Sequence, residues 1–277
     1  MDFIRGVDPI DSLNIGKKAI IKKWLDNMGI ENYTINKDYS IDVKYSVDIS
    51  GRGLKELPDF IKFGIVGLSF YCHNNNLTSL KGCPDEVRLY FLCYRNELTS
   101  LEYSPRKVGF LVCSHNKLTS LEFLPEITVR GIDCSYNRLV SLEGCPSVLN
   151  WGLDCSHNRL TSLKGGPKRI KSGFYDCSHN RLTSLRYGPS KVEGHFSCQK
   201  NKIKSLRGLK ATIEGHFNCR NNEITDLNNN SLTVGRNFEC YNNPTKFTSE
   251  YVKEHVKVGK RAIVVMPYIS GAYLQNK

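Results

Sequence analysis

The sequence predicts a solenoid, in which short coils of chain stack on one another instead of enclosing one compact core. Three regular series support this fold class. Nine cysteines recur at intervals of 20 to 22 residues, an asparagine stands three residues after each of them, and leucine or isoleucine follows at two further fixed positions in eight copies. Chance does not produce nine copies of one pattern, so each copy is expected to form one coil.

Each coil is expected to contain a short β-strand that ends near the cysteine. Two residues before the cysteine stands an aromatic or aliphatic residue, such as Phe91 before Cys93. Residues two apart point to the same face of a strand, so both side chains should face the interior. Strands of successive coils should pair in parallel, about 4.8 Å apart. The cysteines of this series are Cys72, Cys93, Cys113, Cys134, Cys155, Cys177, Cys198, Cys219 and Cys240.

The asparagines are expected to hold neighbouring coils together. Each stands where a strand must end and backbone groups lose their partners, and an amide side chain can both donate and accept hydrogen bonds. The sequence therefore predicts a ladder of asparagine side chains that runs from coil to coil. Its members are Asn75, Asn96, Asn116, Asn137, Asn158, Asn180, Asn201, Asn222 and Asn243.

The rest of each repeat is expected to turn inward and then return. The leucines five and eight residues after the cysteine should face the interior, and the Thr-Ser pair between them should hydrogen-bond within the next turn. A Gly-x-Pro element follows. It suits a return segment without a full helix, because 21 residues leave little room for one.

The pattern F-x-C-x-x-N-x-L resembles the signature L-x-L-x-x-N-x-L of leucine-rich repeats, with cysteine in place of the second strand leucine. The longer form C-S-x-N-x-L-T-S-L-x-G-x-P is similar to the short repeats of leucine-rich repeat proteins from bacteria and tailed bacteriophages. The resemblance implies a right-handed, β-rich solenoid with a parallel sheet on its concave side and little or no helix on its convex side. It also implies binding as the usual role, without naming a partner.

An N-terminal cap is predicted over residues 1–46, because the repeat pattern begins after them. Apolar residues at helical spacing predict a helix over Ile10–Met28 that is ended by Gly29. The segments Tyr33–Ile35 and Ser40–Val43 predict a small hairpin. Such a cap would cover the otherwise exposed interior of the first coil.

The repeats are predicted over residues 47–247, with Arg52 in place of the asparagine in the first coil. Residues 248–277 are predicted to form a small C-terminal α/β cap. It would consist of a short helix over 249–256 and a strand in the segment RAIVVMPY. We expect caps and repeats to form one continuous domain.

The cysteines are interpreted as buried, reduced thiols, because cysteine at one fixed position of a repeat behaves as a small apolar side chain. Disulfides are disfavoured, since Cβ vectors of neighbouring parallel strands run side by side. Only Cys83 and Cys145 lie outside the series. Three Cys-x-His pairs suggest a metal site, but other copies carry Asn, Arg, Tyr or Lys at the histidine position. No metal or cofactor is therefore expected. The pairs are Cys113 with His115, Cys155 with His157, and Cys177 with His179.

The chain contains none of the enzyme motifs G-x-x-x-x-G-K-[ST], G-x-S-x-G or H-E-x-x-H, so we expect a protein that is not an enzyme and has no small-molecule substrate. Its N-terminus lacks the basic region and apolar core of a secretory signal. No apolar run approaches the ~20 residues that span a bilayer. These features favour a location in the cytoplasm and no membrane partner. For a phage-encoded protein, this is the cytoplasm of the host cell.

The candidate binding surface is the concave face of the sheet. Residues that flank each inward cysteine should point outward, and they are apolar or aromatic in the first coils, acidic in the middle and mixed at the end. Exposed apolar residues indicate that a partner contacts them or that the N-terminal cap folds over them. The candidate partner-binding residues are Tyr71, His73, Leu92, Tyr94, Val112, Asp133, Asp154, Asp176, Arg220 and Tyr241.

A basic stripe follows the cysteines at a distance of four residues, and part of it is expected to pair with the neighbouring aspartates. Its members are Lys117, Arg138, Arg159, Arg181 and Lys202. The wider segment Arg159–Lys210 carries thirteen Lys and Arg side chains against two acidic ones, within a net charge of +12. This excess is compatible with nucleic acid, with an acidic protein, or with a solvated surface.

The favoured hypothesis is a non-enzymatic protein–protein interaction module that binds a host or phage protein through its concave face. Its phage origin rests on the resemblance alone. The alternative is a binder of nucleic acid or another polyanion through residues 159–210. A structural role in a virion stays open as well.

Overall fold

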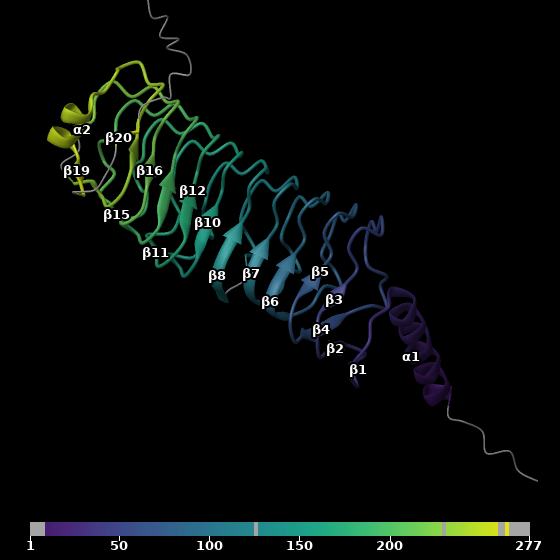
Figure 1. Ribbon diagram of the computed structural model, residues 1–277. Helices are drawn as coiled ribbons and strands as arrows, with labels where there is room; N and C mark the ends of the chain where they lie inside the picture. Colours follow the sequence, from purple (N-terminus) through teal and green to yellow (C-terminus); the bar gives the residue numbers. More distant parts are fainter. Residues whose placement is uncertain (1–8, 125–126, 229–230, 260–263, 266–277) are drawn as a thin grey trace, which may run out of the picture. The chain divides into compact units, whose positions relative to one another are not determined.

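The computed structural model describes residues 9–124, 127–228, 231–259 and 264–265. It consists of two compact units, whose stacked coils are drawn in Figure 1. The first unit comprises the residues up to 118 together with 122–129, and the second comprises 119–121 and the residues from 130 onward. Each unit is a stack of short coils. The predicted boundaries between caps and repeats do not coincide with this division, and they stay predictions.

The first unit begins with helix α1 (Pro9–Met28) and an antiparallel hairpin of β1 (Tyr33–Ile35) and β2 (Ile41–Val43). Both elements lie where the sequence predicted a helix and a hairpin. The helix ends at Gly29, whose backbone has a positive φ of 70°, a conformation that favours glycine. The Trp24 ring packs 6.4 Å from the Phe63 ring, so the helix contacts the apolar interior of the unit.

Parallel strands follow the hairpin in the first unit. One path runs β2–β4–β6–β7, and β3 pairs with β5, which pairs with β6. The register places Phe70 opposite Phe91, and Phe91 opposite Leu111. The strands are β3 (Val47–Asp48), β4 (Phe63–Val66), β5 (Phe70–Tyr71), β6 (Glu86–Leu92) and β7 (Lys107–Val112). The predicted F-x-C strand is thus confirmed in these coils.

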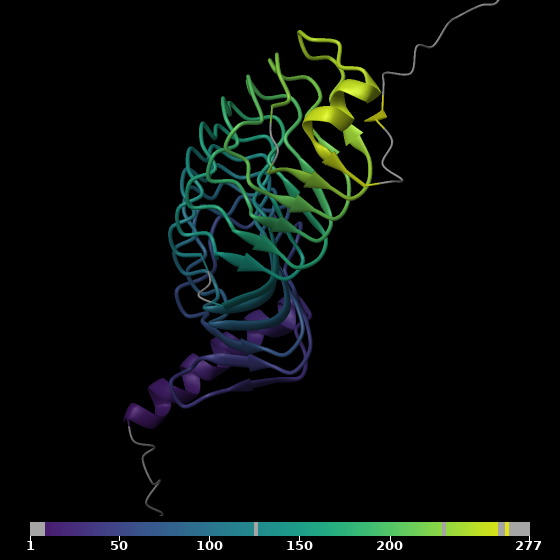
Figure 2. The same ribbon diagram turned by 90° about the vertical axis from the view of Figure 1, so that its left-hand side faces the viewer.

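The main sheet of the second unit is also parallel, and its strands stack in the order of the sequence (Figure 2). The register repeats from coil to coil, with Leu153 opposite Tyr175 and Tyr175 opposite Phe196. The strands are β8 (Ile127–Asp133), β10 (Gly152–Asp154), β12 (Phe174–Asp176), β14 (His195–Ser197), β16 (Phe217–Asn218), β18 (Phe238–Glu239) and β20 (Val264–Val265).

A second parallel sheet in the second unit was not predicted. Its strands contain two residues each, and all but the last precede a strand of the main sheet by two or three residues. Helix α2 (Ser249–His255) lies just before its last strand, within the predicted 249–256. The strands are β9 (Val148–Leu149), β11 (Arg169–Ile170), β13 (Lys191–Val192), β15 (Thr212–Ile213), β17 (Thr233–Val234) and β19 (Lys257–Val258).

Glycines permit the bend between the two sheets. A Cβ atom on Gly194 would overlap the carbonyl oxygen of Gly173 in the preceding coil, and one on Gly215 would overlap the carbonyl oxygen of Gly194. The coils approach so closely at this point that no side chain fits between them. A glycine four residues before Cys198 and Cys219 is therefore required by the coil spacing.

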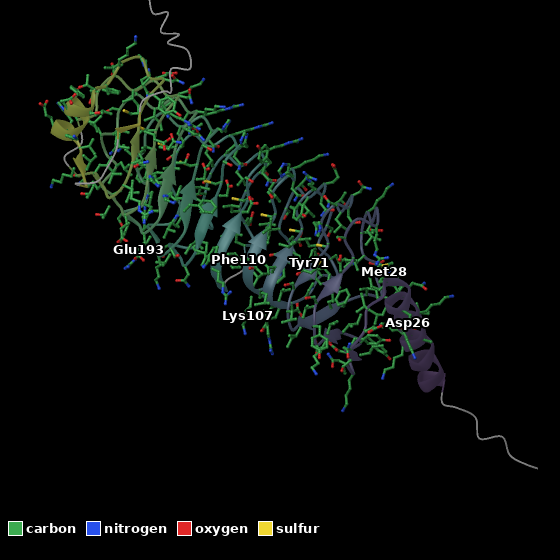
Figure 3. All side chains as sticks on the ribbon, in the orientation of Figure 1. Asp26, Met28, Tyr71, Lys107, Phe110 and Glu193 are labelled. Atoms are coloured by element: carbon green, nitrogen blue, oxygen red, sulfur yellow. The ribbon has the colours of Figure 1, made fainter. Side chains whose placement is uncertain are left out.

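The interior of each coil is apolar and contains the cysteines. Cys155, Cys177 and their two strand neighbours Leu153 and Tyr175 are fully buried, as are the repeat leucines. All eleven cysteines carry free thiols, and the sulfur atoms are visible inside the coils (Figure 3). Burial raises the pKa of the Cys155 and Cys177 thiols well above their usual range. Such thiols stay protonated and are poor nucleophiles.

The predicted asparagine ladder is present in both units. Asn180 Nδ2 donates to the carbonyl oxygens of Cys155 in the preceding coil at 3.0 Å and of Cys177 in its own coil at 3.1 Å, and its Oδ1 accepts from Leu160 N at 2.9 Å. Asn96 makes the same bonds in the first unit. One buried amide thus satisfies backbone groups of two coils that the turn leaves without strand partners.

The residue before each ladder asparagine has a left-handed backbone. Its φ lies between 52° and 55° in all nine copies, although none of these residues is glycine. This conformation ends the strand at the cysteine and turns the asparagine inward. The nine residues are Asn74, Arg95, His115, Tyr136, His157, His179, Lys200, Asn221 and Asn242.

A serine of the repeat forms a hydrogen bond in the turn. Ser162 Oγ accepts from Lys164 N at 3.1 Å, as predicted for the turn after the leucines.

In the first coil Arg52 replaces the asparagine, and its backbone N–H donates to Asn75 Oδ1 at 2.9 Å. Its guanidinium donates instead to Met28 O at the end of α1, 3.1 Å away. Arg52 therefore joins the first coil to the helix.

Replacement of Asn180 by alanine should lower the free energy of unfolding by about 3 kcal/mol, since several buried backbone groups then lose their partners. Thr183→Ala is the control, because Thr183 is exposed on the same coil, and it should change the free energy by less than about 0.5 kcal/mol. Urea titrations followed by circular dichroism measure both values. Equal effects of the two substitutions would contradict the ladder.

Candidate binding surfaces

An aromatic patch lies on the outward face of the main sheet in the first unit. It consists of Tyr71, His73, Leu92, Tyr94 and Val112, which flank the inward cysteines and are all partly exposed. The Tyr71 and His73 rings meet edge to face at 6.2 Å, and the His73 and Tyr94 rings stack at 4.5 Å (Figure 3 labels Tyr71). Five predicted site residues are thus close neighbours on one surface.

The His73 ring makes this patch less polar. Burial lowers the pKa of His73, against an opposing effect of the Asp48 carboxylate, so the neutral ring is favoured. Its Nδ1 atom is buried and has no hydrogen-bond partner among the described residues. Helix α1 contacts Phe63 and Arg52. The residues of the aromatic patch are still partly exposed in the presence of the helix.

The second unit carries a column of three aspartates on the same face of its main sheet. The register places Asp133, Asp154 and Asp176 directly opposite one another on β8, β10 and β12. Each carboxylate accepts a hydrogen bond from the backbone N–H two residues later, at 2.8 to 3.0 Å. The pKa of Asp154 is raised to about 6, chiefly by burial and also by the two flanking aspartates, against the lowering effect of the Ser156 hydrogen bonds.

Arg220 and Tyr241 lie together toward the last strands of the main sheet. The Arg220 guanidinium hydrogen-bonds to the Tyr241 hydroxyl and to Gln199 Oε1, and its central carbon lies 5.4 Å from the Tyr241 ring centroid. Glu239 stands 4.0 Å from the same guanidinium. The two predicted residues therefore form one hydrogen-bonded cluster, in which the arginine is already oriented.

The basic stripe does not pair with the aspartates. Within the described residues no ion pair joins Arg138, Arg159 or Arg181 to the aspartate column, so this expectation is wrong. The carboxylates bind backbone N–H groups instead, and the stripe lies beyond the left-handed turn. Arg138, Arg159, Arg181 and Lys202 are exposed, whereas Lys117 in the first unit pairs with Glu97.

A stack of rings separates the two columns of charge in the second unit. Tyr136 and His157 stack at 4.0 Å, and His157 and His179 at 3.9 Å. All three rings belong to residues in the left-handed position before the ladder asparagine. Burial, His157 and Lys200 lower the pKa of His179. In the part of the chain that the structure describes, no three metal-ligating side chains come together.

Sequence reasoning missed this ring stack and two further exposed aromatic residues. The stacking of the histidines follows from the left-handed backbone, which residue types such as His, Tyr and Lys do not signal. Trp151 and Phe174 are exposed by 57% and 43% at the bend between the sheets. They occupy adjacent positions of the repeat, four residues before Cys155 and three before Cys177, so periodicity did not identify them.

The raised pKa of Asp154 predicts a stability that depends on pH. The folded-state pKa exceeds the unfolded-state value, so the ionised carboxylate destabilises the fold. This cost is absent below pH of about 4 and grows as the pH rises toward 6. Asp154→Asn should therefore raise the free energy of unfolding by about 2 kcal/mol at pH 8 and leave it nearly unchanged at pH 3.5. Denaturant titrations at both values measure the difference, and a gain that does not depend on pH would refute the assignment.

No protein-family model matches the sequence, and no curated protein sequence matches it. Among solved structures, YopM from Yersinia enterocolitica WA-314 is similar, with 18% identity and a TM-score of 0.44. The match covers 73% of this chain and 61% of the YopM chain, so this chain spans less than two thirds of YopM. The leucine-rich repeat domain of APL1B is similar with 13% identity, a TM-score of 0.42 and 95% of each chain covered.

These matches concern fold alone. No helix in the described ranges combines the length and apolarity required to cross a membrane. The structure itself shows parallel strands spaced 20 to 22 residues apart and a buried asparagine that joins each coil to the one before. On this evidence both units have the fold of leucine-rich repeat proteins, with repeats of about 21 residues.

Proposed function

We propose that the chain is a non-enzymatic protein-binding module whose partner contacts the outward face of the main sheet. The aromatic patch of Tyr71, His73, Leu92, Tyr94 and Val112 is the observation that carries this proposal. Its rings are held in place by mutual stacking, yet they keep exposed area. Contiguous exposed apolar residues on a soluble protein mark interaction sites, and rigid aromatic side chains lose little entropy when they are covered.

The second unit adds groups that give specificity. The Asp133, Asp154 and Asp176 column supplies negative charge, and Arg220 with Tyr241 supplies a preoriented cation beside a ring. Tyrosine and arginine are enriched among residues that dominate binding energy. A partner of the first unit would therefore present apolar groups to the aromatic patch, and a partner of the second unit would present basic groups to the aspartates. A host or phage protein in the cytoplasm is the proposed source, because the repeats resemble those of bacteria and phages.

Three substitutions test the outward face. Capture from bacterial lysate by the tagged chain, followed by mass spectrometry, should recover a partner whose yield falls at least tenfold with Tyr94→Ala, Asp154→Arg or Tyr241→Ala. Tyr45→Ala is the control, because Tyr45 is 48% exposed outside this face. Circular dichroism confirms that each variant is folded. A recovery unchanged by all three substitutions would reject the proposal.

A polyanion is the second candidate, and the unpaired basic stripe favours it. Arg138, Arg159 and Arg181 are exposed on successive coils beside stacked rings, and Lys202 continues the row. Some other cations of the basic segment form ion pairs: Arg169 and Lys191 pair with Glu193, at 2.7 and 3.4 Å. Among the described residues Arg159, Arg181 and Lys202 form no ion pair, and they lie in one row that is accessible to phosphate groups.

Charge reversal separates this second candidate from a solvated surface. The double substitution Arg159→Glu and Arg181→Glu should weaken binding to single-stranded DNA at least tenfold at low salt. It should also reduce the slope of log K against log salt by about 1.4, since two phosphate contacts are lost. Lys171→Glu with Lys210→Glu makes the same charge change elsewhere and should have a smaller effect. If the chain is not retained on DNA or heparin at low salt, the polyanion-binding proposal is rejected.

A further inference from the structure

Three bulky residues occupy a backbone conformation that other coils give to glycine. Among the described residues, the tenth residue after the cysteine has a positive φ in seven coils, and it is glycine in four of them. The glycines are Gly82, Gly144, Gly165 and Gly208. In the remaining coils Tyr103, Phe123 and Tyr187 have φ values of 64°, 63° and 66°. A left-handed backbone disfavours side chains of this size, so these three coils carry strain that glycine would remove.

Packing does not compensate for this strain. Tyr103, Phe123 and Tyr187 are exposed by 53% to 54%, so each ring keeps about half of its surface in water. Strained residues persist where the surrounding structure imposes them, and they cluster at functional sites. The three exposed rings are therefore available to contact a partner.

Tyr103 and Phe123 border one hollow in the first unit. Its volume is about 540 Å³, and its lining includes the buried Ile61, Leu101 and Pro105. Ser104 Oγ donates to Phe123 O at 2.8 Å, which ties the two turns together. The hollow thus combines an apolar floor with two aromatic walls from neighbouring coils. We call it the aromatic groove.

Charge around the aromatic groove is unbalanced. Lys81 Nζ and Asp59 Oδ1 lie 2.7 Å apart and neutralise each other. Lys62 and Arg106 also line the groove, and neither takes part in an ion pair among the described residues. Asp85 is the one unpaired carboxylate of the lining. Because two cations and only one carboxylate of the lining are unpaired, the groove favours a ligand with an anionic group. The two acidic residues of the lining disfavour a polyanion.

We propose that the aromatic groove binds a short acidic peptide segment of a partner protein. A carboxylate of the segment would lie at Arg106 and Lys62, and an aliphatic or aromatic side chain beside it would pack between Tyr103 and Phe123. A volume of 540 Å³ holds only a few residues, so the contact is a small one. The inference rests on the proposed role in protein binding, but it uses a surface separate from the aromatic patch.

Oriented peptide pools provide the probe. Each pool contains hexapeptides with random positions around one fixed central residue, which is Glu, Gln or Lys. The immobilised full-length chain should retain the Glu pool at least threefold better than the Lys pool, with aliphatic and aromatic residues enriched next to the glutamate. Tyr103→Gly and Phe123→Gly should each reduce retention of the Glu pool at least fivefold, and Arg106→Glu should remove the preference for Glu over Lys.

A matched control uses the third strained residue. Tyr187→Gly makes the same backbone change in the second unit and should leave retention unchanged. All three glycine variants should have a melting temperature equal to that of the parent chain or up to about 3 °C higher, because strain is relieved. Tyr94→Ala should retain the peptides, since Tyr94 belongs to the aromatic patch.

Several results would overturn the proposal. The chain could retain none of the peptide pools, or it could prefer the Lys pool. Retention could also be unaffected by Tyr103→Gly and Phe123→Gly. Finally, the melting temperature of both variants could fall by several degrees, which would show that the rings are structural. Peptide binding that is lost with Tyr94→Ala alone would place the peptide on the aromatic patch. The proposed protein-binding role would then stand while the groove assignment fails.

Discussion

The buried asparagine side chain is the interaction on which both units depend. The turn that follows each short parallel strand has no ladder partners, and unpaired buried backbone groups are costly. Asn158 meets this demand by donating to the carbonyl oxygens of Cys134 and Cys155, at 3.0 and 3.2 Å, while Leu139 N donates to it at 2.9 Å. The left-handed residue before it, the inward leucines after it and the spacing of coils all follow from this geometry.

The fixed repeat period also determines which side chains are neighbours on the surface, and therefore which ligands the surface can bind. Each position of the repeat becomes a column, so side chains of one kind collect at the distance of neighbouring strands. Burial and the neighbouring aspartates then raise the pKa of Asp154, and rings stack, as at His157 and His179. Such columns are rigid because the backbone ladder fixes their spacing. They suit recognition of a partner with a matching row of groups, which is the basis of the proposed binding role.

The sequence was sufficient to predict the strands, the inward cysteines and the asparagine ladder, because these depend on periodicity alone. Alternation also identified Tyr71 and Tyr94 as outward residues. It did not predict the second sheet, since a two-residue strand such as Val148–Leu149 has no period to detect. Nor did it predict the unpaired Arg159. Whether a side chain finds an ion pair or a ring depends on how neighbouring coils are oriented, and residue order does not encode that directly.

Hydrogen exchange of the asparagine side-chain amides tests the central claim most directly. In nuclear magnetic resonance spectra of the native chain, the Nδ2 protons of Asn96, Asn158 and Asn180 should exchange at least a hundredfold more slowly than those of the exposed Asn76. Slow exchange is expected because each amide is buried and donates to two or three carbonyl oxygens. Exchange as fast as that of Asn76 would contradict the account, since the coils would then lack the bonds that join them.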